Sequence, residues 1–488
     1  MKTGDHPKLS RVLLGKDILA LAFGAMIGWG WIVMTGTWIQ SAGSLGAITA
    51  FVVGGIAIIL VGLTYAELAA AMPKVGGEHV YSYRALGHFS SFICTWAIVL
   101  GYMSVVSFEA VALPTVVEHL FPGYSVGHLW TVAGWEVEAT WVAVGLAGSV
   151  AMMAINYVGI RTAALVQKLV TALIMVVGVM FITGALFTGD TATMDPLFNV
   201  EEGVIGGIMI VLIMVPFMFV GFDVIPQAAE EINLPFREIG RVLMLSVILA
   251  VFWYALIILG TGLMLTPAAL SQSTLAVPDA MQAVFNAPWA GKLMVLAGVA
   301  GIITSWNAFY VGGSRAIYAL AEAGMLPAFL AKLHPVHKTP VNAILMIGAI
   351  SSLAPFFGRP ALVWLVNSGG LGIVIAYLFV AISFLVLRQR EPDMERPFRV
   401  SNGKLVGGIA AVLSVGMILL YLPGSPSALT GLEWLIFGGW MLLGLAMYLW
   451  SRKRYGVGYS DRIMFEEPEL MDPEKAAERE QAASKPAT

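Results

Sequence analysis

The sequence predicts an all-α membrane protein with about 12 transmembrane helices. Of its 488 residues, 58% are hydrophobic and 12% are charged, and the apolar residues are spread along almost the whole chain. A run of about 20 apolar residues is long enough to span a hydrocarbon core of about 30 Å. The predicted spans are 17–38, 43–66, 89–115, 139–157, 163–188, 204–228, 240–264, 290–318, 340–356, 360–387, 405–423 and 431–451.

Two of these spans contain residues that interrupt helices. The segment from Asp17 to Trp38 includes Gly24, Gly28 and Gly30, and the segment from Pro216 to Pro226 is broken by glycine and proline. In a bilayer every backbone N–H and C=O needs an internal partner, so a spanning helix unwinds only where it is buried or lines a cavity. Two such breaks in corresponding positions of two halves indicate a midplane substrate site in a secondary transporter.

Lysine and arginine residues divide unequally between the two sides of the membrane. With a cytoplasmic N-terminus, the inner side holds Lys2, Lys8, Arg11, Lys16, Lys74, Arg84, Arg161, Arg237, Arg241, Arg315, Lys332, Lys338, the segment Arg388 to Lys404, and Arg452 to Arg454. The outer loops carry Glu118, Glu136, Glu138, Asp190, Asp195, Glu201 and Glu202, with Lys292 and Arg359 as basic exceptions. The positive-inside rule therefore predicts a cytoplasmic-membrane protein with both termini in the cytoplasm.

Three further features of the sequence limit the class of protein. They are the two ends of the chain, the cysteine content and the absence of catalytic motifs. No basic segment with a cleavage site precedes the first span, so we expect that span to be retained. Cys94 is the only cysteine, which excludes a disulfide within the chain and a thiolate metal site. Residues 455–488 are charged and predict a solvated tail. We expect no enzyme, because no nucleophile elbow, P-loop or His-Glu-x-x-His motif occurs.

Short motifs recur between the predicted spans. They are Tyr65-Ala66-Glu67-Leu68-Ala69, Pro73-Lys74-Val75-Gly76-Gly77-Glu78-His79-Val80-Tyr81, Gly221-Phe222-Asp223, Glu230-Glu231-Ile232-Asn233-Leu234-Pro235, Gly313-Ser314-Arg315, Gly324-Met325-Leu326-Pro327 and Arg396-Pro397-Phe398-Arg399-Val400. Together they resemble the amino acid–polyamine–organocation (APC) superfamily, in the expected order. The resemblance implies two inverted five-helix repeats with discontinuous helices one and six. The implied divisions are a tail 1–16, repeats 17–188 and 204–387, peripheral helices 405–451 and a tail 452–488.

The resemblance implies a substrate site where the two broken helices meet. Unwound backbone from Met26 to Gly30 would expose amide groups that favour an anion and carbonyls that favour a cation, and an amino acid zwitterion carries both charges. We expect the amides to hold the carboxylate, and carbonyls near Met26 and Phe219 to hold the ammonium. The expected substrate-binding residues are Met26, Ile27, Gly28, Trp29, Gly30, Glu109, Phe219, Phe222 and Asp223.

Trp29 departs from the family pattern, in which a small residue usually stands between the glycines. Its indole would narrow the pocket or stack on an ammonium group. Alternatively, it packs against neighbouring helices.

Asp223 follows the break at Gly221 near mid-membrane, where an ionised carboxylate is costly unless it is paired. It could be a counter-ion for a cationic substrate, a protonatable switch, or a cap for the broken helix. Glu109, in the third span, could line the substrate route or bond to a neighbouring helix. Glu67 is expected to form an interfacial ion pair near Lys74 or an inner gate, and His79 is expected to face solvent.

The coupling ion has two candidate sites. Thr304 and Ser305, joined by carbonyls of Gly24, Ile27 and Gly301, resemble the second sodium site of sodium-coupled transporters with this fold, although hydroxyls also hold helices together. Many sodium-independent members carry a lysine on the fifth helix, and that place, aligned on Val166-Gln167, is Ile174 here. The sequence therefore leaves Na⁺ at these five residues and H⁺ at Asp223 as alternatives, with no other cofactor expected.

The sequence predicts a symporter or exchanger that imports a small amino acid by alternating access. The alternative cargo is a cationic amine or polyamine held by Asp223 and Trp29. A membrane sensor would need an output domain, and the tail beyond Arg454 is too short and polar to form one. The expected partners are the amino acid or amine and membrane lipid, without nucleic acid, and the oligomeric state is left open.

Overall fold

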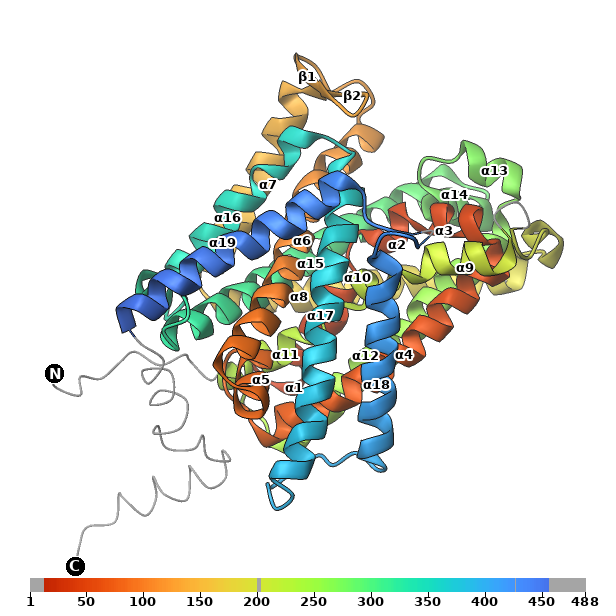
Figure 1. The fold of residues 1–488 in the computed structure, drawn as a ribbon. Coiled ribbons are helices and arrows are strands. Elements are labelled where there is room, and N and C mark those ends of the chain that lie inside the picture. Colours follow the sequence, from red (N-terminus) through yellow and green to blue (C-terminus); the bar gives the residue numbers. More distant parts are fainter. Residues whose placement is uncertain (1–12, 200–202, 426, 456–488) are drawn as a thin grey trace, which may run out of the picture.

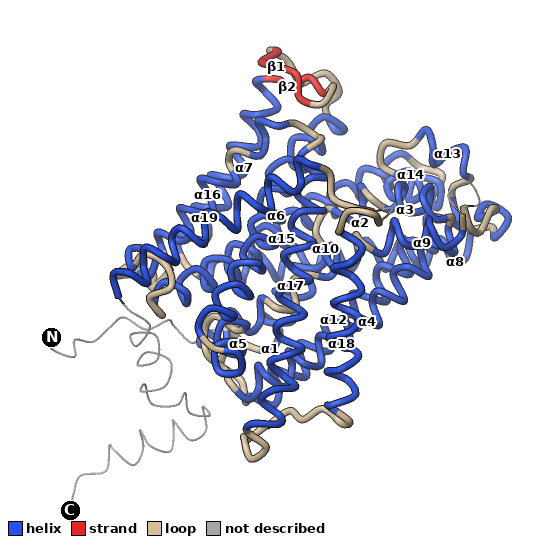
Figure 2. The backbone as a smooth tube through the Cα atoms, in the orientation of Figure 1, coloured by secondary structure: helices blue, strands red, loops and turns tan. Residues whose placement is uncertain are grey.

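The computed structural model describes residues 13–199, 203–425 and 427–455, and this part of the chain is almost entirely helical (Figure 1, Figure 2). Within it, 10 helices are long and apolar enough to cross a membrane, and a shorter apolar segment covers Val341–Phe357. The broken segment 204–228 supplies one further span. The predicted all-α class with about 12 spans is confirmed, whereas the predicted tails at 1–12 and 456–488 lie outside the described residues.

The first five predicted spans correspond to helices, and only the first of these spans is interrupted. They are α1 (Gly15–Met26) continued by α2 (Gly30–Val33) and α3 (Thr35–Ala42), then α4 (Ser44–Ala71), α6 (His88–Leu120), α7 (Ala139–Val158) and α8 (Ile160–Thr188). The links hold α5 (Glu78–Leu86), an antiparallel hairpin of β1 (His128–Val132) and β2 (Trp135–Glu138), and a 3₁₀ turn η1 (Thr191–Met194). The hairpin, red in Figure 2, projects from one end of the bundle.

The remaining spans follow in the same order as predicted. They are α9 (Val204–Leu212), α10 (Val215–Phe219) and α11 (Val224–Gln227), then α12 (Phe236–Met264), α15 (Pro288–Glu322), α16 (Val341–Ser351), α17 (Ala361–Arg390), α18 (Gly403–Tyr421) and α19 (Gly431–Tyr455). The shorter elements are η2 (Ala229–Glu231), α13 (Pro267–Gln272), α14 (Ala276–Phe285), η3 (Ala328–Ala331) and η4 (Ala354–Phe357). The division into two five-helix repeats stays a prediction.

The centre of the bundle is formed by α6 and α15. Helices α6 and α15 pack against each other and are the most buried spans in the described part, whereas α18 and α19 are the most exposed. Helix α18 lies beside α17 (Figure 1). Helix α19 packs against α6, where the ring of Trp440 stacks on that of Trp96 with centroids 4.5 Å apart. The peripheral place expected for the last two helices stays a prediction.

The two broken helices touch each other at their breaks. Gly221, between α10 and α11, has φ +137°, a conformation that side-chain-bearing residues rarely adopt. A Cβ atom at Gly221 would lie 2.7 Å from the Cβ of Ala25 and 2.9 Å from the backbone nitrogen of Met26. The expected discontinuities in the first and sixth spans are thus confirmed, and glycine is what allows the two backbones to meet.

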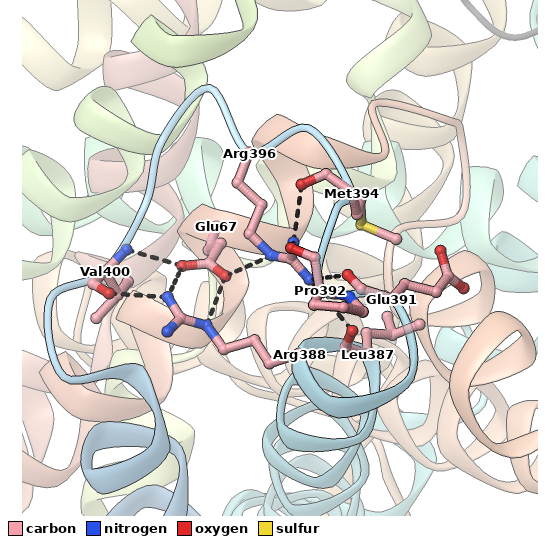
Figure 3. A network of polar contacts seen from close by, with 8 residues as sticks. All are labelled: Glu67, Leu387, Arg388, Glu391, Pro392, Met394, Arg396 and Val400. Atoms are coloured by element: carbon pink, nitrogen blue, oxygen red, sulfur yellow. Dashed lines mark hydrogen bonds and ion pairs between the residues drawn. The ribbon is translucent and has the colours of Figure 1, made fainter.

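Glu67, at the end of α4, is fully buried in a network of polar contacts (Figure 3). Arg388 donates to its carboxylate from Nε at 2.8 Å and from Nη2 at 2.5 Å, and the backbone N–H of Val400 donates at 2.7 Å. Arg396 forms a further ion pair at 3.1 Å. The expected ion pair of Glu67 is confirmed, but its partners are Arg388, in the last turn of α17, and Arg396, in the α17–α18 link, rather than Lys74 nearby in the sequence.

Candidate functional site

A small cavity lies between the two broken helices and α6, α12 and α15. Its volume is about 20 Å³, which accommodates one water molecule but no amino acid, so binding requires the lining to move. The lining residues are Ala25, Met26, Gly28, Gly30, Val105, Phe108, Glu109, Phe217, Met218, Tyr254, Ser305 and Phe309. Four predicted substrate-binding residues are therefore brought together here, namely Met26, Gly28, Gly30 and Glu109.

Tyr254, on α12, connects the two breaks. Its hydroxyl donates to the carbonyl of Met26 at 2.7 Å and to that of Met218 at 3.2 Å. Met26 ends α1 and Met218 lies near the end of α10, so each broken helix contributes one carbonyl. Sequence reasoning missed Tyr254 because a tyrosine in a long apolar span is usually a packing residue. The carbonyl from the sixth span was expected near Phe219, whose ring instead lies 5.2 Å from that of Tyr254.

The amide side of the first break faces Glu109. The backbone N–H of Trp29 donates to Glu109 Oε1 in a long contact of 3.5 Å. A Cβ atom at Gly28 would lie 2.5 Å from the same oxygen and 2.9 Å from the Cβ of Ser305. Gly28 is therefore required for the close approach of α6 and α15 to the unwound backbone, and Glu109 borders the cavity at the end where an anion was expected.

The indole of Trp29 does not line the cavity. It packs against Gly298 of α15, where an added Cβ atom would collide with the ring. In this conformation the structure agrees with the packing alternative, and Trp29 contributes its backbone to the site.

Asp223 bonds to the backbone of the second break and lies outside the cavity. Its Oδ1 accepts the backbone N–H of Gly221 at 2.6 Å, and its Oδ2 accepts the hydroxyl of Tyr102 at 2.7 Å. Phe222 packs between Tyr65 and Tyr377, with centroid distances of 5.3 and 5.6 Å. Asp223 stands at the N-cap position of α11, but its side chain accepts no hydrogen bond from that helix, so it bonds to the break and to α6 instead of capping α11 as one alternative anticipated. Asp223 and Phe222 form a group separate from the cavity.

The predicted sodium ligands are divided between two surroundings. Thr304 donates to the carbonyl of Gly301 within its own helix at 2.8 Å, whereas Ser305 lines the cavity beside Gly28. A Cβ atom at Gly301 would lie 3.1 Å from the carbonyl oxygen of Ile27, so α15 lies directly against the first break.

Gly24 faces two polar side chains of α8 that the sequence analysis did not assign. A Cβ atom at Gly24 would lie 2.5 Å from Gln167 Nε2 and 2.7 Å from Thr171 Oγ1. Gln167 Nε2 donates to the carbonyl of Ala20 at 3.2 Å, and Asn307 Nδ2 donates to Gln167 Oε1 at 3.0 Å. Two polar side chains of α8 therefore lie beside Gly24.

His79 is buried, with a relative exposure of 1%, so the expectation of a solvent-facing histidine is wrong. It lies in the first turn of α5, and its Nδ1 is 2.8 Å from the hydroxyl of Ser91 on α6. Helix α5 folds back against α6 and α17 and covers the ring.

These features define the class of protein. A polytopic helical protein in which two broken helices bring backbone carbonyls and amides together around a buried cavity has the architecture of a membrane transporter. The amino acid permease family model matches residues 15–445, and the chain belongs to this family. The predicted resemblance to the APC superfamily is confirmed.

Characterised relatives match the chain over most of its length. The branched-chain amino acid permease BcaP of Bacillus subtilis is 29% identical over 92% of this chain and 95% of its own. The methylthioribose transporter of the same organism is 27% identical, over 91% of this chain and 94% of its own. Its aspartate-proton symporter is 24% identical, over 82% and 78%. The protein is therefore a multi-pass membrane transporter.

Proposed function

We propose that the protein imports small neutral amino acids as a secondary active symporter or exchanger, by alternating access around the two broken helices. The observation that carries this proposal is the Tyr254 hydroxyl bonded to one carbonyl from each break. A donor at this point occupies the position that a substrate ammonium would take. The amides of Gly28 to Gly30 would then receive the carboxylate, because unpaired N–H groups at a helix start favour an anion.

The remaining lining suits an aliphatic side chain. Val105, Phe108, Phe217 and Phe309 are apolar and border the cavity, and a branched-chain permease is among the relatives. A cationic amine is less well supported, because Asp223 bonds to Tyr102 and Gly221 outside the cavity and the indole of Trp29 packs on α15.

We propose H⁺ as the coupling ion, with Asp223 as a proton-binding residue. Asp223 is fully buried and forms no ion pair among the described residues, and a neutral acid avoids the cost of an unpaired buried charge. One relative is named as a proton symporter. Sodium bound at Gly24, Ile27, Gly301, Thr304 and Ser305 is the competing outcome of the test below.

The proposed orientation follows the charge distribution. Both termini would lie in the cytoplasm, because Arg84, Arg241, Arg388 and Arg396 gather at the loops of one side while Glu136 and Glu138 occupy the opposite hairpin. The Glu67 network and α5 would then lie on the cytoplasmic side of a cytoplasmic membrane.

The decisive experiment is thermal unfolding of the purified protein with leucine, valine, alanine, putrescine and methylthioribose, each with and without Na⁺. A ligand at 100 times its Kd stabilises by about 2.7 kcal/mol. We expect an aliphatic amino acid to stabilise the protein independently of Na⁺. The same amino acid, radiolabelled, should exchange across the membrane of liposomes that contain the protein. Stabilisation by putrescine alone would overturn the amino acid proposal, and dependence on Na⁺ would overturn the choice of H⁺.

A further inference from the structure

A group of buried polar side chains lies beyond Asp223, at the end of the bundle that carries α5. Its central residue is Glu78, the first residue of α5, whose side chain is fully buried. In the sequence α5 stands between the membrane-spanning helices α4 and α6, and in the structure it lies beside α11 (Figure 1). The proposed transport mechanism uses Asp223 but gives no role to Glu78. Burying an ionisable carboxyl group costs free energy unless it is paired or hydrogen-bonded.

Glu78 is joined to the broken sixth span through Gln227. The Nε2 of Gln227, the last residue of α11, donates to Glu78 Oε2. The backbones also meet, because Gly76 N–H donates to the carbonyl of Gln227 at 3.4 Å, and a Cβ atom at Gly77 would lie 2.9 Å from that of Pro226. A movement of α11 relative to α5 would therefore change the surroundings of Glu78 directly.

Unpaired polar atoms point into the same region. Glu78 Oε1 and the hydroxyls of Tyr65 and Tyr377 are buried and form no hydrogen bond within the described ranges. The ring of Tyr65 lies 5.8 Å from that of Tyr377, and Tyr102 donates to Asp223. A tyrosine hydroxyl both donates and accepts a proton, so these side chains can connect two carboxyl groups.

The electrostatic environment of Glu78 favours its neutral form. Burial raises the pKa of the Glu78 carboxyl well above its usual range, and the nearby charge of Asp223 raises it further. The titratable groups that interact electrostatically with it come from several of the elements around it, namely Tyr65 of α4, Tyr81 of α5, Cys94 and Tyr102 of α6, Asp223 before α11 and Tyr377 of α17. None of these groups is a cation, so a proton is the available neutralising charge.

We propose that Glu78 is a second proton-binding residue of the transport cycle, which receives the proton from Asp223 and releases it on the proposed cytoplasmic side. In this step the Asp223 acid becomes a carboxylate, a tyrosine hydroxyl donates one proton while it accepts another, and the Glu78 carboxylate becomes an acid. Separation of α5 from α11 then admits water, which takes the proton. The inference rests on the proposed H⁺-coupled transport and adds a release group that is not part of the substrate cavity.

The test compares two assays of the purified protein in liposomes. Exchange of labelled amino acid at equal pH requires no net proton movement, whereas accumulation driven by a pH gradient does. One coupled proton and a gradient of one pH unit can concentrate a neutral substrate about tenfold. We expect Glu78→Gln to keep exchange and to lose this accumulation. The matched control is Glu230→Gln. Glu230, in η2 just after α11, accepts the N–H of Val75 just before α5, and its replacement should retain both activities.

A second variant tests the proposal independently, in case Glu78→Gln does not fold. Gln227→Leu removes the donor to the charged carboxylate and should shift the pH midpoint of driven transport upward, because the neutral acid then persists to higher pH. Full accumulation by Glu78→Gln, or an unchanged midpoint in Gln227→Leu, would overturn the proposal. Wild-type exchange without any accumulation would overturn proton coupling and this inference together, whereas absence of exchange would refute the proposed transport itself.

Discussion

The hydroxyl of Tyr254 lies 2.7 Å from the carbonyl oxygen of Met26, and the same hydroxyl reaches the carbonyl of Met218 at 3.2 Å. One side chain of α12 thus satisfies two buried acceptors that belong to different broken helices. Because unwinding a helix leaves such carbonyls without partners, the Tyr254 hydroxyl stabilises the closed, substrate-free arrangement around the cavity.

Removing this hydroxyl should weaken the free protein and strengthen substrate binding. Tyr254→Phe leaves both carbonyls unsatisfied, which costs about 1–3 kcal/mol in unfolding free energy. A substrate ammonium would then restore the missing donor, so we expect Kd to fall by about fivefold to tenfold. Thermal unfolding with and without amino acid measures both effects.

The control for Tyr254→Phe is Tyr421→Phe. The Tyr421 hydroxyl is also buried and donates to a carbonyl of the sixth span, that of Ile213, at 2.9 Å, but it lies outside the cavity. Its loss should lower stability without changing Kd. Weaker binding by Tyr254→Phe would mean that the hydroxyl contacts the substrate itself.

Gly28→Ala should impair substrate binding. The added Cβ atom would lie 2.5 Å from Glu109 Oε1 and 2.9 Å from Ser305, so the unwound backbone must move away from α6 and α15. Overpacking of this kind costs about 1–3 kcal/mol, which corresponds to roughly 5–150-fold weaker binding. Gly416→Ala on α18, where no atom lies within 4 Å of the new Cβ, should bind as the wild type does. Equal Kd values for the two variants would show that the close approach at Gly28 has no role in binding.

The spans and their breaks were predictable because both depend on local chemistry. A bilayer requires long apolar segments, and glycine and proline mark where such a segment can unwind, as at Gly28 and Gly221. The predicted boundaries of most spans therefore lie within a few residues of those observed.

Contacts between distant segments were not predictable from the same patterns. Tyr254 and Met26 are separated by 228 positions, and neither residue type indicates the other. Glu67 was expected near Lys74 because the two are close in sequence, whereas its partners are Arg388 at the end of α17 and Arg396 in the α17–α18 link. The resemblance identified these motifs but could not show which of their residues contact one another. Such contacts depend on how segments that are distant in the sequence pack together in the fold.

Glu67→Gln should destabilise the protein strongly. The change keeps the size of the side chain but leaves Arg388 and Arg396, with exposures of 14% and 5%, without their anion. Removing one partner of a buried ion pair costs about 3–5 kcal/mol. Glu238→Gln breaks the exposed pair with Arg241 and should cost at most about 1 kcal/mol. Similar melting temperatures for both variants would contradict a stabilising role of the Glu67 network.

His79 should make the protein less stable in mild acid. Burial lowers the pKa of its imidazole to about 3, with the neighbouring His88 as a smaller cause, whereas the unfolded chain titrates near 6.5. Between these values the unfolded state binds a proton that the folded state does not, so stability is complete above pH 6.5 and falls as the pH decreases. The loss is about 1.4 kcal/mol per pH unit, or about 2 kcal/mol at pH 5.

The measurement is thermal unfolding of wild type, His79→Phe and His337→Phe at pH 7 and pH 5. His79→Phe also loses the contact with Ser91, which lowers stability at both pH values, so the informative quantity is the difference between them. We expect that difference to shrink by about 2 kcal/mol in His79→Phe. His337 is exposed, and its replacement should leave the difference unchanged. An unaltered difference in His79→Phe would show that the ring is not kept neutral by burial in the folded protein.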